Sequence, residues 1–170
     1  MSESPSEPTS VEPPPLPPEA EVLSEYQGVK GWLFFFCFSL TVLGPLVTIA
    51  SLIAGFGMSL KYFEEYPGLL VMLIIDAVLS LGISGFGMYA GIKLWRIRPG
   101  AVLAAKQVLY CTLAYHAVGM VLPWIGGLPP EDTKAMVVES VRDVMRGLIH
   151  FAIWFSYLNK SKRVRATYTS

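Results

Sequence analysis

Four side chains that can carry charge or exchange protons lie close together before the last apolar stretch of the chain. The segment RDVMRGLIH, residues 142–150, contains Arg142, Asp143, Arg146 and His150, and it runs directly into the apolar segment FAIWFSYL. In a helix, Arg142, Arg146 and His150 follow one row of residues four apart, so one face presents them together. Ionisable groups in such a setting are costly to bury and need partners.

Two further ionisable side chains, Asp76 and His116, interrupt apolar stretches elsewhere in the chain. If these stretches cross a membrane, a rise of ~1.5 Å per residue puts Arg146 roughly 10 Å below the outer boundary, Asp76 roughly 12 Å and His116 roughly 13 Å. The matching depths predict a buried polar layer. We expect Asp76 to face Arg146 or Arg142 there, with His116 nearby.

This predicted layer has two interpretations. It could be a structural salt bridge that fixes the register of the helices, or a site for a proton, an ion or a small solute. The structural interpretation is favoured, because no second acidic residue lies deep enough to form a proton relay and Asp143 can be neutralised by Arg146 on its own helix.

Neither a metal site nor an enzyme is expected. The spacing of Asp76, His116, Asp143 and His150 matches no metal-binding pattern. An intramembrane hydrolase needs a nucleophile with a base, paired aspartates or a metal, and none is spaced recognisably here. We therefore expect no metal, no cofactor and no enzymatic activity.

The elements that position these groups follow from composition. Hydrophobic residues make up 53% of the chain and charged residues 15%, and the apolar residues come in long blocks. This composition is typical of an integral membrane protein. Both cysteines, Cys37 and Cys111, fall inside apolar blocks, where a thiol behaves as a small hydrophobic group, so no disulfide is expected.

About 20 helical residues are needed to cross ~30 Å of hydrocarbon. Three apolar blocks meet this length, the first with a kink expected at Gly44-Pro45. The fourth, from Gly147 to Leu158, is too short unless its helix also takes in the charged residues before it. The predicted helices cover about 31–60, 68–95, 101–125 and 131–158, the last starting with Pro130 in its first turn and Glu131 and Asp132 beside it.

The distribution of basic residues supports four crossings. With four crossings, nine basic residues share the side of both termini and two lie on the other. The nine are Lys30, Lys93, Arg96, Arg98, Lys106, Lys160, Lys162, Arg163 and Arg165, and the two are Lys61 and Lys134. We therefore predict an all-α integral membrane bundle of four transmembrane helices with both termini cytoplasmic. The aromatic belts agree, with Trp32, Trp95, Trp154 and Tyr157 near the inner interface and Tyr62, Tyr66 and Trp124 near the outer one.

The first 27 residues contain six glutamates, seven prolines and no basic residue. They offer almost nothing that could form a core, so we expect a disordered, acidic cytoplasmic tail in front of a transmembrane domain at 28–168. The segment PPPLPP could serve as a polyproline ligand, but an extended spacer is favoured.

The second predicted helix carries a row of small residues that let helix backbones approach closely. The row comprises Ala77, Ser80, Ser84, Gly87 and Gly91. Packing inside one bundle is the favoured interpretation, and a homo-oligomer formed through this face is the alternative.

Two end motifs resemble a known family. GVKGWLFFF places Gly31, Trp32 and Leu33 at the start of the first crossing, and YLNKSKRVRATY places Ser161 to Val164 straight after the last. Both resemble the bacterial membrane-protein family catalogued as domain of unknown function 2569, over residues 28–168. The resemblance implies a small multi-pass inner-membrane protein without an established activity, so it transfers no catalytic or binding residues.

From these observations we expect an interaction or accessory component of the bacterial inner membrane. A small transporter or channel-like subunit that uses the Asp/Arg/His cluster is the alternative. The expected partners are the lipid bilayer and other membrane proteins, and not nucleic acid.

Overall fold

The computed structural model describes residues 28–168, and within them all regular structure is helical. In chain order the elements are α2 (Trp32–Phe38), the π-helical segment η1 (Ser39–Leu43), α3 (Gly44–Ser59), the 3₁₀ segment η2 (Leu60–Tyr62), α4 (Pro67–Trp95), α5 (Ala101–Gly119), the 3₁₀ segment η3 (Leu122–Trp124), α6 (Pro130–Lys160) and α7 (Lys162–Tyr168). The predicted all-α class is confirmed. The tail predicted for residues 1–27 lies outside the described residues.

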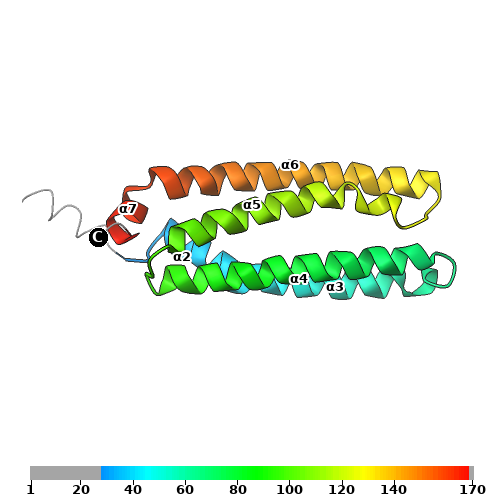
Figure 1. The fold of residues 1–170 in the computed structure, drawn as a ribbon, viewed down its shortest axis with the longest axis horizontal. Coiled ribbons are helices and arrows are strands. Elements are labelled where there is room, and N and C mark those ends of the chain that lie inside the picture. The colour runs from blue at the N-terminus through cyan, green and yellow to red at the C-terminus, as the bar shows by residue number, and fades with distance from the viewer. Residues whose placement is uncertain (1–27, 169–170) are drawn as a thin grey trace, which may run out of the picture.

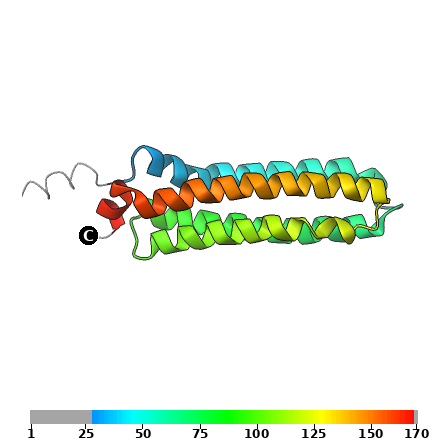
Figure 2. The same cartoon turned by 90° about the horizontal axis from the view of Figure 1, so that it is seen from above.

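The long helices run antiparallel along one axis (Figures 1 and 2). We call the end that holds the start of α2, the α4–α5 turn and α7 the terminal end, and the opposite end, with the α3–α4 and α5–α6 connections, the far end. In sequence order α3 packs on α4, α4 on α5 and α5 on α6. No comparable interface joins α3 to α6 within residues 28–168.

The first long stretch is distorted where a kink was expected. The Gly44 amide donates to the Ser39 carbonyl, five residues back, which widens the turn just before Pro45. Proline has no amide hydrogen and its ring crowds the preceding turn, so a widened turn accommodates it without ending the helix. The Thr41 hydroxyl donates to the Cys37 carbonyl (2.8 Å) beside this turn.

A dry core closes the terminal end. Its buried members come from α2, α4, α5, α6 and α7 and are Leu33, Phe36, Cys37, Leu94, Ala101, Ala105, Leu109, Trp154, Leu158 and Val164. The short helix α7, which the sequence did not predict, folds back over this core. It is held by the Tyr168 hydroxyl, which donates to the Leu94 carbonyl (2.7 Å), and by the Gly28 amide, which donates to the Thr167 hydroxyl (3.2 Å). Burial raises the pKa of Tyr168 well above its usual range.

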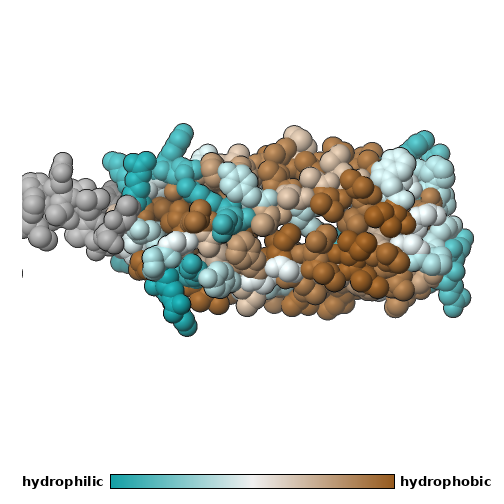
Figure 3. Space-filling model, viewed as in Figure 1, coloured by the Kyte–Doolittle hydropathy of each residue, from teal (hydrophilic) through white to brown (hydrophobic). Residues whose placement is uncertain are grey.

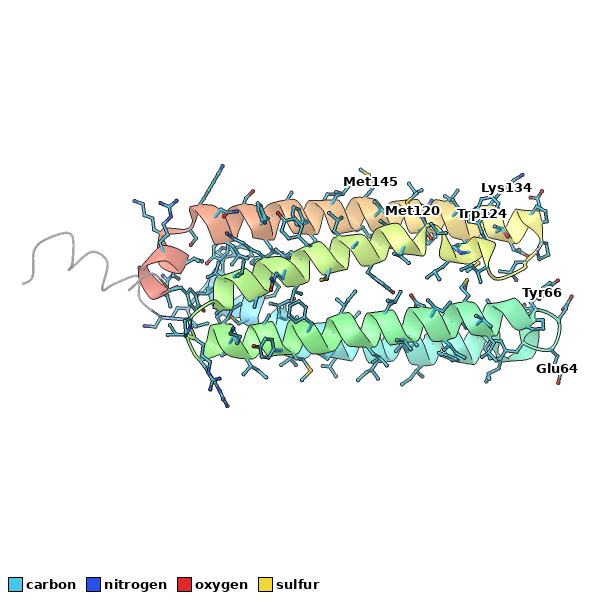
Figure 4. The ribbon with its side chains drawn as sticks, in the orientation of Figure 1. Glu64, Tyr66, Met120, Trp124, Lys134 and Met145 are labelled. Atoms are coloured by element: carbon cyan, nitrogen blue, oxygen red, sulfur yellow. The ribbon has the colours of Figure 1, made fainter. Side chains whose placement is uncertain are left out.

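A smaller cluster ties the far end together. Leu69 and Met72 of α4 pack with Leu122 of η3. A Cβ on Gly68 would lie 2.7 Å from the Ile125 carbonyl oxygen, so only glycine allows this close approach. Figure 4 shows Glu64, Tyr66, Trp124 and Lys134 grouped near the far end.

Three helical stretches are long and apolar enough to cross a membrane, namely Trp32–Tyr62, Pro67–Trp95 and Ala101–Trp124. On the face shown in Figure 3, hydrophobic residues cover the middle of the bundle and hydrophilic residues gather at its ends. The helix α3 has no buried residue, as a surface that faces lipid allows. The helix α6 matches the three in length but carries four charged residues between Glu139 and Arg146, so its composition does not mark it as a fourth span.

Candidate functional site

Five of the six predicted polar residues line a cavity inside the bundle. The cavity has a volume of about 720 Å³ and is lined from η1, α3, α4, α5 and α6. A second cavity of about 370 Å³ lies toward the far end. Both are lined by Asp76, Tyr115, His116 and Asp143, so these four side chains stand where the two cavities meet.

Each of three helices lines the larger cavity with a row of residues spaced for one helix face. These rows include Gly44, Thr48, Ser51 and Gly55 on α3, Asp76, Ser80, Ser84 and Gly87 on α4, and Val108, Thr112 and Tyr115 on α5. Spacings of three and four residues keep each row on one side of its helix. Because most of these side chains are small, the helices part here without filling the space between them.

The Asp76 carboxylate is held by a tyrosine. The Tyr115 hydroxyl donates to Asp76 Oδ1 at 2.7 Å, joining α5 to α4. No ion pair links Asp76 to Arg146 or Arg142 within the described residues, so the predicted pairing is wrong. The partner of Asp76 is instead Tyr115, and the adjacent residue His116 lines the same cavities as Asp76.

The charged residues of α6 satisfy one another. Arg146 Nη1 lies 2.8 Å from Asp143 Oδ1 and 3.8 Å from Glu139 Oε1, and Arg142 Nη1 lies 2.8 Å from Glu139 Oε2. Residues three apart on a helix are neighbours, so these pairs form without any help from another helix. Because the arginines are paired on their own helix, neither forms an ion pair with Asp76. The pair of Arg146 and Asp143 agrees with the expectation that Arg146 neutralises Asp143.

The two histidines occupy different parts of the wall. A Cβ on Gly147 of α6 would lie 2.5 Å from His116 Cδ2, so this glycine makes room for the imidazole between α5 and α6. His150 lies one turn closer to the terminal end, with its ring centroid 6.2 Å from that of Trp154. Both histidines line the larger cavity, together with Asp76, Asp143 and Arg146. Arg142 lines neither cavity and is thereby the one predicted cluster residue outside them.

The cavity has a closed end and an open side. Toward the terminal end it stops at Leu40, Gly87 and Val108, where Leu40 also packs on the dry core. Beyond this floor, Trp154 of α6 stacks against α2, with ring centroids 4.5 Å from Phe36. Arg146 also lines the cavity, yet 70% of its side chain is exposed, so the cavity opens to its surroundings beside α6.

The row of small residues on α4 serves two purposes: one member allows close packing against η1, and others line the cavity. Gly91 lies under η1, where a Cβ would come 2.5 Å from Thr41 Cγ2. Ser80, Ser84 and Gly87 line the cavity, and the Ser80 hydroxyl donates back to the Ala77 carbonyl (3.2 Å).

Sequence reasoning missed two parts of the site. Tyr115 carried a usable signal, because a tyrosine inside an apolar block needs a hydrogen-bond partner and Asp76 was the acidic group at its depth. The row on α3 from Gly44 to Gly55 was also visible as a period of three and four. In the described part of the chain no three histidine, cysteine or acidic side chains are grouped to hold a metal ion.

Comparison with known families assigns the chain to one of them. The model of the family described as "Protein of unknown function (DUF2569)" matches residues 26–169, so the chain belongs to that family. No curated protein and no solved structure matches the chain. The resemblance seen in the two end motifs is thus confirmed.

Proposed function

We propose that this DUF2569 protein crosses the bacterial inner membrane four times and binds a small solute in its central cavity, as a transporter or channel-like subunit. The observation that carries the proposal is the cavity of about 720 Å³, which several helices line with ionisable and hydroxyl side chains. Cavities of about 300–1,000 Å³ with a few converging polar groups are the usual form of small-molecule sites. The proposal assigns binding and passage to these groups and no catalysis.

The closed floor favours transport over a purely structural role. A salt bridge that only fixes helix register needs no space around it, whereas this polar layer stands beside a large volume. A site that opens beside α6 and is blocked toward the terminal end by a packed core is compatible with one of the two states of alternating access. The blocking contacts are those of Trp154 with α2.

Four crossings are supported by the length and direction of α6. Its 31 residues extend for about 46 Å, and it runs antiparallel to α5 back to the terminal end. Two of its charged side chains, Asp143 and Arg146, line the cavity, which lowers the cost of their depth in the membrane. The nine-to-two distribution of basic residues supports a cytoplasmic location for both termini.

An interaction or accessory role is the second candidate, favoured by the pair of Arg142 and Glu139. Their side chains are 66% and 52% exposed in the first half of α6. A polar strip at membrane depth is a surface that a helix of another membrane protein can cover.

Cysteine accessibility tests the proposed function. In a chain whose Cys37 and Cys111 are replaced by Ala and Ser, Ser80→Cys places a thiol on the cavity wall, and Val78→Cys places one on the outer surface of the same helix. We expect a water-soluble, membrane-impermeant maleimide added to intact spheroplasts to label the first variant and not the second, because a thiol surrounded by lipid is not ionised.

Equal protection of both thiols would mean that the cavity is dry, and the solute-binding proposal would then be wrong. Reporter fusions after Ser170 and within residues 129–134 test the topology separately. The first should report cytoplasmic and the second external, and an external carboxyl terminus would contradict four crossings.

A further inference from the structure

The charges around the cavity do not cancel. On α6 the acidic residues Glu139 and Asp143 pair with the basic residues Arg142 and Arg146, so these four formal charges sum to zero. Asp76 has no such partner within residues 28–168, and it accepts a hydrogen bond from the neutral hydroxyl of Tyr115. With neutral histidines, one negative charge is left at the junction of the two cavities.

An isolated carboxylate in a low-dielectric site is costly, and a bound cation offsets that cost. The neutral Tyr115 hydroxyl stabilises the charge without cancelling it. The carboxylate also lines both cavities, so a ligand in either one can reach it.

The size and chemistry of the wall indicate what kind of cation fits. A volume of about 720 Å³ suits an organic molecule better than a dehydrated metal ion. Among the described residues no cluster of three potential metal ligands exists, which a tightly held inorganic ion would need. The wall offers the aromatic rings of Phe56 and Tyr115 instead, and such rings attract ammonium groups through their π faces.

We propose that the ligand of the cavity is a small monovalent organic cation whose ammonium group lies against the Asp76 carboxylate. This inference rests on the proposed function, namely that the cavity binds a solute, and it adds the charge and chemical class of that solute. Aliphatic side chains of α3 and α4, such as Leu52 and Ile83, then surround the carbon part of the ligand.

The experiment compares two probes of the same shape. One is choline, and the other is its uncharged carbon isostere, in which a quaternary carbon replaces the nitrogen. Binding of each to the full chain in uncharged maltoside micelles is measured by isothermal titration calorimetry. We expect choline to bind about tenfold more tightly than the isostere, since one ion pair in a partly buried site contributes a factor of that order.

Three variants assign this preference to one carboxylate. Asp76→Asn should bind both probes equally, with the affinity for the isostere unchanged, and the isostere then reports that the cavity is intact. Asp76→Glu should keep the preference for choline. Asp132→Asn removes an acidic group in the first turn of α6, outside both cavities, and should behave as the unmodified chain.

Each failure has a distinct meaning. Equal binding of both probes by the unmodified chain would retain solute binding but overturn the cation inference. A preference that survives Asp76→Asn would overturn the role of Asp76. Binding of neither probe at millimolar concentration would overturn solute binding itself and the inference with it.

Discussion

At the terminal end, side chains of α2, α4, α5, α6 and α7 meet in a dry core, whereas further along the same bundle the helices part around a polar cavity. The residues at the two levels explain the contrast. Phe36, Leu94 and Trp154 fill the space at the terminal end, while the small side chains of Ser51, Ser80 and Ser84 leave it empty in the middle. One bundle therefore contains both a packed core and an open cavity, and the volume of the side chains at each level of the helices decides which of the two forms there.

The contrast also concerns polar groups. At the terminal end, hydrogen bonds such as that from Tyr168 to the Leu94 carbonyl fasten α7 to the bundle. In the cavity, the hydrogen bond from Tyr115 to Asp76 joins two helices but leaves a formal charge in place. Polar groups at the dry core therefore fasten the helices together, whereas the cavity retains the negative charge of Asp76.

The largest expected effect comes from truncating Trp154, a large side chain of the dry core. Trp154 is 6% exposed and stacks with Phe36, so Trp154→Ala should lower the free energy of unfolding by about 3–5 kcal/mol. Circular dichroism during unfolding in mixed micelles measures this. Trp124→Ala is the control, because that side chain is 71% exposed at the far end, and its loss should be about 0.5 kcal/mol. Equal losses would mean that the two ends do not differ in packing.

A middle-sized effect is expected where α4 meets the widened turn. A Cβ at residue 91 would come 2.5 Å from Thr41 Cγ2 and 3.2 Å from Leu40 Cβ, so Gly91→Ala should cost about 1–3 kcal/mol in unfolding free energy. Gly85→Ala is the matched control. Nothing lies within 4 Å of a Cβ there, so it should be neutral or stabilise the helix by up to about 1 kcal/mol. A neutral Gly91→Ala would show that η1 can move away from α4.

The helical architecture could be predicted because its signals are local. Apolar blocks, Pro130 and the acidic first turn of α6 gave helix positions that the structure reproduces closely, except that the third helix ends at Gly119 and not near residue 125. The partner of Asp76 could not be predicted from depth alone. Arginine and tyrosine candidates lay at similar depths, and the choice depended on how α6 rotates and on whether Glu139 and Asp143 satisfy the arginines first.

The cavity itself depends on information that is not local. Its volume arises from three facing rows of small and polar residues, and a single row, such as that on α4, is equally compatible with close packing. Gly91 packs closely under η1, whereas Ser80, on the same row, lines the cavity. The difference lies in what α3 and α6 present opposite each residue, and this follows only from the assembled bundle.

The smallest expected effect tests the contact that replaced the predicted ion pair. Tyr115→Phe removes the hydroxyl that donates to Asp76, and Asp76→Asn removes the charge that accepts it. A double-mutant cycle of the two should give a coupling of about 1 kcal/mol in unfolding free energy, a typical size for a hydrogen bond within membrane-embedded helices.

The same cycle with Arg146→Gln in place of Tyr115→Phe is the comparison. Arg146 is paired with Asp143 on its own helix, so its effect and that of Asp76→Asn should add to within about 0.3–0.5 kcal/mol. Coupling confined to Tyr115 would mean that Asp76 is bound within the protein by a neutral donor, so that its charge is available to a ligand in the cavity. Coupling of similar size to Arg146 would instead mean that the carboxylate is neutralised within the protein. The cavity would then differ from the dry core in packing alone and not in charge.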